Sequence, residues 1–214
     1  MASGPFRVAL TFDAEHPDRP ARAGNDERLL DALAAAAVRA TFFVQGRWAE
    51  AFPGIARRIA TDGHLVGSHT YYHARVPLFS DTGLETDIRD AEAAIGEHVG
   101  VDPRPWVRFP FGAGARDAGL LSRLADLGYA RHVGWHVAPD DWEPGRTRDD
   151  LVDRVVGGAE RHGDGAVVLL HTWPDPTFAG VPDVVHRLSA SGASFVTVDE
   201  LDDPPVGIPA DDTE

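Results

Sequence analysis

The stretch His64-Leu65-Val66-Gly67-Ser68-His69-Thr70-Tyr71-Tyr72-His73 runs from a short apolar segment into two histidines four residues apart. The segment from His64 to Gly67 lies between turn signals and is typical of a short buried strand. If the residues after it curl into one helical turn, the imidazoles of His69 and His73 lie on the same side and can meet on one cation. Two neutral imidazoles with a carboxylate and open positions form a hydrolytic site for zinc or a similar divalent ion. A pair of surface or hydrogen-bonded histidines is the other interpretation of this spacing.

Apolar segments that end in polar residues recur on both sides of this stretch and alternate with amphipathic segments. The segment 26–39, for example, has Leu29, Leu30 and Leu33 at helical spacing, and Asn25 is expected to be its N-cap. The predicted strands are 6–12, 40–44, 64–69, 106–109, 129–137, 166–170 and 194–198. The predicted helices are 26–39, 53–60, 84–98, 117–127, 151–161 and 182–190.

Strands that alternate with helices in this way indicate a parallel sheet with right-handed crossovers. Seven or eight such units can close into a barrel, and an open doubly wound sheet is the competing fold. The glycine-rich phosphate loops of nucleotide-binding folds are missing from the sequence, which favours the barrel. We expect one α/β domain over residues 1–205 and an acidic, disordered tail over residues 206–214.

The charge and composition exclude several classes of protein. Acidic side chains number 34 and basic ones 20, for a formal net charge of −14, and such a surface repels nucleic acid. No cysteine is present, which excludes disulfides, thiolate zinc sites and cysteine nucleophiles. The sequence contains no apolar run long enough for a membrane span and no N-terminal stretch like a signal peptide. We therefore expect a cytoplasmic protein, with a secreted form trimmed of its leader as the alternative. The expected substrate is a small molecule or an oligosaccharide, and the sequence leaves the oligomeric state open.

Polar side chains gather where the predicted strands end. In parallel α/β folds, reactive side chains lie at the carboxyl ends of the strands. Five of the predicted strands lead into an acid, a base or a ligand at that edge: Asp13, His69 with His73, Arg108, Asp141 and His171. Scattered core or surface residues would not be expected to collect in this way. The clustering therefore favours a metal site over a structural pair of histidines.

At this point the sequence resembles a known family, the polysaccharide deacetylases (NodB-homology domain, carbohydrate esterase family 4). The matching segments are Thr11-Phe12-Asp13, His69-Thr70-Tyr71-Tyr72-His73, Arg108-Phe109-Pro110-Phe111-Gly112, Asp141-Trp142 and Leu170-His171. They follow the order of the family's five motifs, and the resemblance covers about residues 6–200. It implies a distorted (β/α)7 barrel in one domain, and a metal-dependent hydrolase that removes an acetyl or similar acyl group from an amide.

The resemblance also implies roles for the catalytic residues. Asp13 would be the general base that acts on a metal-bound water, since a divalent ion lowers the pKa of that water to roughly 7. His171 would be the general acid that protonates the leaving amine, a role that suits an imidazole. Asp141 would hold and charge-tune His171, and Arg108 would pair with Asp13.

The remaining roles implied by the resemblance concern the metal and the substrate. His69 and His73 would be metal ligands, most simply of zinc. The backbone N–H of Phe111 would help to hold the oxyanion. Trp142 would form a wall of the acyl pocket, with Leu169 nearby.

Two positions depart from the family pattern. The second aspartate of the first motif, which is the third metal ligand in the family, is Ala14 here, and Ala138 stands where an aspartate usually precedes Asp141 by three positions. Either Glu15 or Asp13 could turn in and complete the site with the two histidines. The metal could instead be held weakly by the histidines and water, or be absent. We expect a metal that is retained but weakened.

Three functions remain open at this level. The expected one is removal of an acetyl or formyl group from an acylamino sugar or a related small acylated amine. The alternatives are a metal-independent hydrolase of ureide or cyclic imide substrates, and a non-catalytic ligand-binding relative. If Asp13 became a metal ligand, Glu15 or His16 could replace it as base. We also expect Ala14→Asp to raise the metal affinity.

Overall fold

The centre of the molecule is a parallel sheet of seven strands, seen in a computed structural model that describes residues 5–18 and 24–207. The strands lie in the order β5-β4-β3-β2-β1-β6, and β7 pairs with the first residues of β1. Their bounds are β1 (Phe6–Ala14), β2 (Thr41–Val44), β3 (Leu65–Ser68), β4 (Trp106–Val107), β5 (Arg131–His132), β6 (Ala166–His171) and β7 (Ala193–Phe195).

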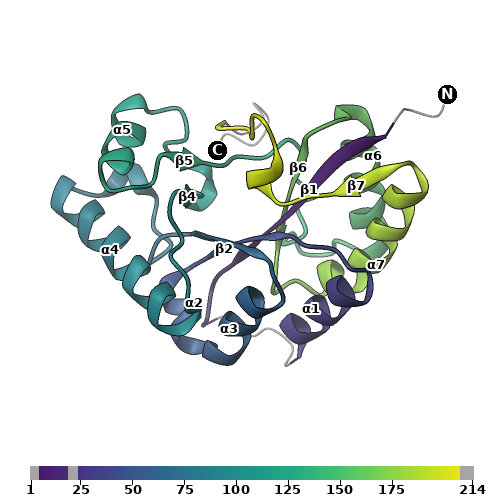
Figure 1. Cartoon of the computed structure of the whole chain (residues 1–214), viewed down its shortest axis with the longest axis horizontal. Helices are drawn as coiled ribbons and strands as arrows, with labels where there is room; N and C mark the ends of the chain where they lie inside the picture. Colours follow the sequence, from purple (N-terminus) through teal and green to yellow (C-terminus); the bar gives the residue numbers. More distant parts are fainter. Residues whose placement is uncertain (1–4, 19–23, 208–214) are drawn as a thin grey trace.

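Helices cover the outer face of this sheet (Figure 1). Within the described residues they are α1 (Asn25–Ala35), α2 (Gly46–Ala51), α3 (Pro53–Thr61), α4 (Asp81–His98), α5 (Ala118–Asp126), α6 (Arg148–His162) and α7 (Asp175–Ala190). In α1, the three leucines at helical spacing are fully buried, and each such side chain contributes roughly 1.5–3 kcal/mol on burial. Short 3₁₀ turns occur at Val76–Leu78, Pro110–Gly112 and Val198–Glu200.

Side chains along β1 alternate between the two faces of the sheet, as the two-residue period of a strand requires. Those on the helix side belong to the main hydrophobic core: Val8, Leu10, Phe12 and Ala14. Ala9 instead packs in a second cluster with Phe43 of β2 and Leu169 of β6, inside the curve of the sheet. Asp13 has the same parity as Ala9, so the strand directs this carboxylate to the inside.

The sheet curls until the segment after β5 meets β6. Val137 forms an isolated parallel bridge with Val168, and the His136 N–H donates to the Val167 carbonyl over 2.8 Å. The result is the single-domain α/β fold with a curled parallel sheet, and the expected distorted (β/α)7 barrel is confirmed.

Several strands are shorter than expected from the sequence, and the two shortest are β4 and β5. Strand β4 ends at Val107, because Pro110 opens a 3₁₀ turn soon afterwards. Strand β5 ends at His132, and the Gly134 N–H beyond it donates to the Pro205 carbonyl over 2.6 Å instead of to a neighbouring strand.

The helix starts also differ from the expected ones. Helix α7 begins at Asp175 with Pro176 in its first turn, so that Pro182 lies inside the helix and does not open it. The N-cap of α1 is Gly24, with φ at 90°, and Asn25 is the first helical residue. The Asn25 amide donates to Asp175 over 3.0 Å, so it ties α1 to α7 and does not cap its own helix.

Helix α2 was not expected from the sequence. Its first residue is Gly46, and the surroundings of this residue explain why it has no side chain. A Cβ atom on Gly46 would lie 2.5 Å from the ring of Tyr71, closer than any side chain allows. The glycine therefore lets α2 approach the loop that follows β3.

The chain returns to the barrel near its carboxyl end. Beside the Gly134–Pro205 hydrogen bond, the His132 ring is bonded through Nδ1 to the Val206 carbonyl over 2.8 Å. Residues 208–214, the greater part of the expected disordered tail, lie outside the described residues.

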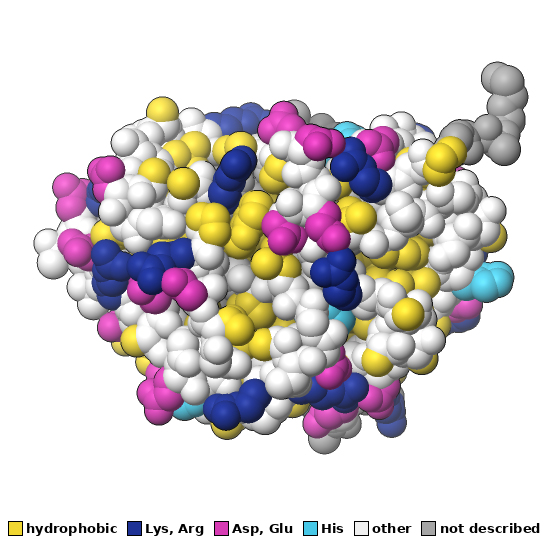
Figure 2. Space-filling model, in the orientation of Figure 1, with side chains coloured by type: hydrophobic (Ala, Val, Ile, Leu, Met, Phe, Trp, Pro, Cys, Tyr) yellow, Lys and Arg dark blue, Asp and Glu magenta, His cyan; other side chains and the backbone are white. Residues whose placement is uncertain are grey.

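Arginine side chains are interspersed with acidic ones on the face shown in Figure 2, so this face presents no single basic patch. No helix among the residues that the structure describes has the length and apolarity that a membrane span needs.

Candidate active site

The residues expected at the carboxyl edge of the sheet do lie there. Asp13 is near the end of β1, His69 directly follows β3, Arg108 directly follows β4, and His171 ends β6. Because these strands are parallel neighbours, their ends bring the four side chains to one side of the barrel.

Arg108 is fully buried and holds the carboxylate of Asp13. Its Nη1 donates to Asp13 Oδ1 over 2.9 Å, and the rest of the guanidinium donates to the carbonyls of Val133 and Gly134 over 3.0 Å each. The guanidinium carbon lies 4.2 Å from the centre of the Phe43 ring. The buried charge is thus paired and hydrogen-bonded, as a charge inside a protein must be. The pairing of Arg108 with Asp13 agrees with the expectation.

Glu15 lies just beyond β1 and brings its carboxylate to both expected metal ligands. Its Oε2 is 3.2 Å from His69 Nε2 and contacts His73 Nε2. Asp13 Oδ2 is 3.6 Å from the same nitrogen of His69. Of the two carboxylates left open as the third ligand, Glu15 therefore contacts both histidines, while Asp13 is held by Arg108.

The tautomer of His69 suits a ligand. Its Nδ1 lies 2.9 Å from the Arg108 carbonyl, and a carbonyl can only accept, so Nδ1 carries the proton. The lone pair of Nε2 is then left for the site. Metal-binding histidines commonly use one ring nitrogen in this way and are oriented by the other.

The residues between His69 and His73 do not form the expected helical turn. Thr70 and His73 both have positive φ, 66° and 58°, which breaks a helix. Asp87 of α4 stabilises the loop, because its carboxylate accepts the N–H groups of Tyr71 and Tyr72 over 2.9 and 3.0 Å. The loop, and not helical spacing, brings the imidazole of His73 to Glu15.

Gln45 joins this loop to the end of β1. Its side-chain oxygen accepts the His16 N–H over 2.9 Å, and its amide nitrogen donates to the Tyr71 carbonyl over 3.1 Å. The side chain is buried at the carboxyl end of β2. It thereby fixes the distance between the two segments that carry Glu15 and His73.

His171 and Asp141 form a second hydrogen-bonded unit. His171 Nδ1 lies 2.7 Å from Asp141 Oδ1, and the His171 backbone N–H donates to Oδ2 over 2.7 Å. The Thr177 hydroxyl also donates to Oδ2, over 2.6 Å. Burial by itself would lower the pKa of His171, but Asp141 and the nearby Glu15 outweigh it and raise this pKa to about 9.

The two units face each other across Glu15. The free nitrogen of His171, Nε2, lies 3.9 Å from Glu15 Oε1, the carboxylate oxygen that is turned away from His69 and His73. Burial by itself would raise the pKa of Glu15, but its interactions with His16, His69 and His73 outweigh it and bring the pKa well below its ordinary value. The carboxylate is therefore ionised and able to bind a cation.

The donor set fits a divalent metal ion. Glu15, His16 and His73 each offer one donor atom, and these atoms lie within 4.8 Å of one another. With His69 beside Glu15, the cluster consists of imidazoles and a carboxylate and contains no thiolate. This combination suits zinc and similar divalent ions.

The residues expected to contact substrate lie in different surroundings. Phe111 and Trp142 are half-exposed, and the ring of Phe111 lies 4.7 Å from that of His73. Leu169 is buried in the interior cluster with Trp135 and Phe43. The structure thus places Phe111 beside His73 of the metal-donor cluster, and Trp142 directly follows Asp141, the hydrogen-bonding partner of His171.

The sequence analysis missed several residues of the site. Gln45, Asp87, Trp173 and Thr177 all bond to a ligand, a loop or an acid of the site. Gln45 also stands directly after a strand, so the rule that identified Asp13 and His171 could have found it. Asp87 and Thr177 lie within helices, where nothing distinguishes them from surface polar residues.

Comparison with known proteins is consistent with this geometry. Residues 2–132 match the family model described as polysaccharide deacetylase. The chain is 32% identical over 209 residues to a peptidoglycan-N-acetylglucosamine deacetylase of Bacillus cereus, covering 93% of this chain and 70% of that one. It is 37% identical over 174 residues to a chitooligosaccharide deacetylase of Rhizobium leguminosarum bv. trifolii, covering 81% and 74%.

Among solved structures, a family 4 carbohydrate esterase from Streptomyces lividans in complex with acetate superimposes with a TM-score of 0.76. The two chains are 29% identical, and the match covers 90% of this chain and 93% of that one. Other relatives are longer: the chain spans 38% of the length of the peptidoglycan-N-acetylglucosamine deacetylase PgdA of Listeria monocytogenes.

Proposed function

The chain belongs to the polysaccharide deacetylase family, and on that premise we propose that it removes the acetyl group from an N-acetylated amino sugar in an oligosaccharide or glycan. The reaction hydrolyses a carbon–nitrogen bond that is not a peptide bond, which is the reaction class of the named relatives. The relatives act on peptidoglycan and chitooligosaccharide, and both are polymers of N-acetylated sugars.

One observation carries the proposal: a proton donor faces the cluster of metal donors. His171 Nε2 is 3.9 Å from the Glu15 carboxylate, whose other oxygen contacts His69 and His73. Amide hydrolysis needs an activated water on one side of the carbonyl carbon and a proton for the departing nitrogen. A binding site without chemistry needs neither of these groups.

We propose that His69, His73 and Glu15 hold a divalent ion. When bound, such an ion supplies Lewis acidity to a water molecule and to the amide carbonyl. Asp13 then takes a proton from the attacking water, and Arg108 keeps this carboxylate in place through its 2.9 Å hydrogen bond.

His171 delivers the other proton. As the bond between carbonyl carbon and nitrogen breaks, Nε2 protonates the nitrogen, and the products are a free amine and acetate. Asp141 orients the ring through Nδ1, so that Nε2 is the nitrogen directed toward Glu15 and the substrate. The Phe111 N–H serves the developing oxyanion in this proposal.

Acetate release from N-acetylglucosamine oligomers tests the proposal. The full chain is assayed as purified, after treatment with a chelator, and after zinc is added back, with the metal content measured in each state. We expect chelation to abolish acetate release and zinc to restore it.

The other outcomes select the alternatives. Turnover that resists chelation would favour a metal-independent hydrolase and overturn the metal assignment. Ligand binding without acetate release from any acylated amine, with His171→Ala leaving the affinity intact, would favour a non-catalytic relative.

A further inference from the structure

His16 lies beside Glu15 and His73 but takes no part in the proposed function. Its Nε2 lies 3.0 Å from Glu15 Oε1, and its ring packs edge-on against that of His73 with the ring centres 4.5 Å apart. Its side chain is largely buried, with 24% of its surface exposed. The imidazole is therefore directed into the site and not into solvent.

A residue that directly follows Glu15 would point away from the site in an extended strand, because side chains alternate. His16 avoids this because its φ is 58°, in the left-handed region that non-glycine residues rarely adopt. The Gln45 side chain holds the turn by accepting the His16 N–H over 2.9 Å. Two consecutive side chains thus reach the same cluster.

Glu15 divides its two oxygens between opposite neighbours. Oε2 faces His69 and His73, whereas Oε1 faces His16 and also accepts the Trp173 indole N–H over 3.4 Å. Trp173 cannot bind a metal, since its nitrogen is only a donor. His16 can, because imidazole is a ligand that suits zinc, copper, iron and nickel.

In the described part of the chain, one donor atom each of Glu15, His16 and His73 lie within 4.8 Å of one another. His69 does not belong to this group of three. We propose that His16 is a further ligand of the divalent ion, so that this chain binds the metal through three imidazoles (His16, His69 and His73) and the Glu15 carboxylate. The inference rests on the metal site of the proposed function and deepens it. A site with four protein ligands still admits water and substrate if the ion takes five or six ligands.

Counting imidazole ligands tests the proposal without measuring activity. The full chain is loaded with Zn²⁺ or Co²⁺ alone, and X-ray absorption fine structure gives the number of coordinated imidazoles. We expect three in the wild type and two in His16→Asn. Asparagine is chosen because it tolerates positive φ better than most residues, and His16→Gly serves as a second variant that keeps this backbone conformation.

Trp173→Phe is the matched control, because it removes the other hydrogen bond to Glu15 Oε1 and no metal donor. It should weaken metal binding while the count stays at three. Competition with a chelator should show affinity for Zn²⁺ reduced by at least about tenfold in His16→Asn, since loss of even an outer-shell partner costs roughly 10–100-fold.

The outcomes separate this inference from the proposed function. A wild type with two imidazoles, or a count that His16→Asn leaves unchanged, would show that His16 only positions Glu15, and the inference falls while the proposed function stands. A wild type that binds neither ion would overturn the metal site itself, and both would fall.

Discussion

Ala14 stands between the two carboxylates Asp13 and Glu15 in the sequence, but its side chain points to the opposite face of the sheet. Ala14 is fully buried in the core between sheet and helices, and it pairs in register with Val44 of β2. Asp13 and Glu15, on either side of it in sequence, both reach the interior site. In the metal site that we propose, a longer carboxylate one residue later, on the face where the histidines lie, takes the place of the family's ligand at position 14.

This geometry argues against the expectation that Ala14→Asp raises the metal affinity. The new carboxylate would be buried among apolar side chains without a partner, which costs several kcal/mol. We expect Ala14→Asp to reduce the free energy of unfolding by more than about 3 kcal/mol and to leave the affinity for Zn²⁺ no higher than in the wild type. Chemical denaturation and chelator competition measure the two quantities. A gain in affinity would show that position 14 faces the metal.

Glu15→Gln gives the complementary test. The amide keeps the shape of the side chain but loses its charge, so the affinity for Zn²⁺ should fall by at least about 100-fold, more than the loss of an outer-shell partner. Glu50→Gln is a suitable control, because that carboxylate lies outside the cluster and bonds to the Tyr71 hydroxyl. Equal affinities of wild type and Glu15→Gln would refute the ligand assignment of Glu15.

Asp141 orients the imidazole of His171 through one carboxylate oxygen. Its Oδ1 holds Nδ1 of His171, and an amide nitrogen placed there would oppose the N–H of the ring. We expect Asp141→Asn to lower kcat for acetate release by about 10²–10⁴-fold, the typical value of a positioned acid or base, with little change in the affinity for Zn²⁺. Asp140→Asn is the matched control, since the neighbouring carboxylate pairs with Arg154 on the surface. A fall in kcat of the same size in both variants would contradict the role of Asp141.

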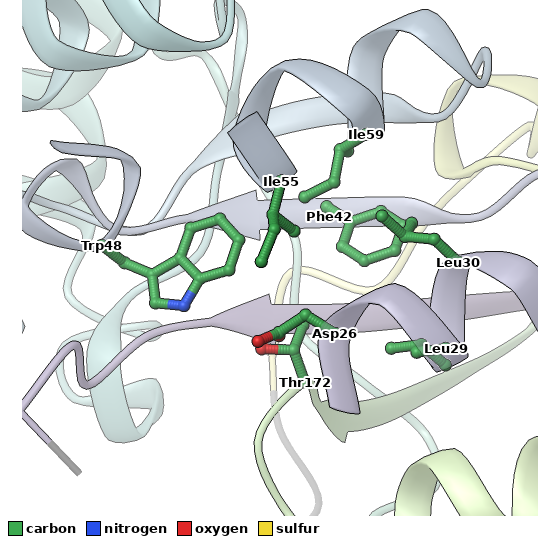
Figure 3. A pocket seen from close by; sticks show the side chains of 8 residues that line it. All are labelled: Asp26, Leu29, Leu30, Phe42, Trp48, Ile55, Ile59 and Thr172. Carbon is green, nitrogen blue, oxygen red and sulfur yellow. The ribbon is translucent and has the colours of Figure 1, made fainter. Parts of the chain in front are cut away.

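At the scale of elements, the first turn of α1 contains an unusual carboxylate. Asp26 lines a small and mostly apolar pocket and points toward Thr172 of the loop after β6 (Figure 3). Burial raises the pKa of Asp26 to about 6, and the neighbouring Thr172 only partly opposes the effect. The helix therefore keeps a carboxyl group that is uncharged in mildly acidic solution.

A pH dependence of stability follows from this pKa. The pKa of Asp26 is higher in the folded state than its ordinary value of about 3.9, so the folded state binds the proton more tightly. This contribution is fully present below about pH 4 and is lost as the pH rises through about 6. Two pKa units correspond to roughly 3 kcal/mol at most, and partial exposure reduces that value to about 1–2 kcal/mol.

Asp26→Asn removes the titration. Relative to the wild type, its free energy of unfolding should increase by about 1–2 kcal/mol between pH 4 and pH 7, as measured by urea denaturation at each pH. Glu85→Gln changes an exposed carboxylate of α4 that does not act on Asp26, and it should leave the wild-type slope unchanged. A constant difference between Asp26→Asn and wild type across this range would be evidence against a raised pKa.

At the scale of the whole molecule, hydrogen bonds other than those between the strands also stabilise the curled sheet. The guanidinium of Arg108 joins β1, through Asp13, to the carbonyls after β5. The segment at Pro205 and Val206 then bonds to Gly134 and His132 from the carboxyl end of the chain. Residues far apart in sequence thus meet around the two shortest strands.

Truncation after Pro204 tests the second of these connections. It removes the acceptors of two buried donors, Gly134 N–H and the His132 ring, at about 1–3 kcal/mol for each group left unsatisfied. We expect the truncated chain to unfold at a Tm several degrees below that of the full chain. A chain truncated after Gly207 keeps both acceptors and is the control. If both truncations lower Tm equally, the stabilisation does not come from these two hydrogen bonds.

Local patterns in the sequence were sufficient for the class of fold and for most of the residues at the site. Apolar segments of strand length and amphipathic segments of helix length reflect burial directly, which is why β1, β2, β6, α4 and α6 were predicted to within a few residues. Because parallel strands end at one edge, the same pattern also placed Asp13, His69, Arg108 and His171 together. The family motifs then supplied the roles.

Tertiary structure alone decided how the loops present their side chains. Positive φ occurs at His16, Thr70 and His73, in segments whose backbone N–H groups bond to Gln45 and Asp87, and these two partners lie far away in sequence. The choice between Glu15 and Asp13 as the third donor depended on Arg108, a buried cation from another strand that claims one carboxylate and leaves the other to the histidines. Sequence specifies which groups arrive at the edge of the sheet, because strand ends are local. Which of them meet depends on distances across the barrel, and only the packed chain sets those distances.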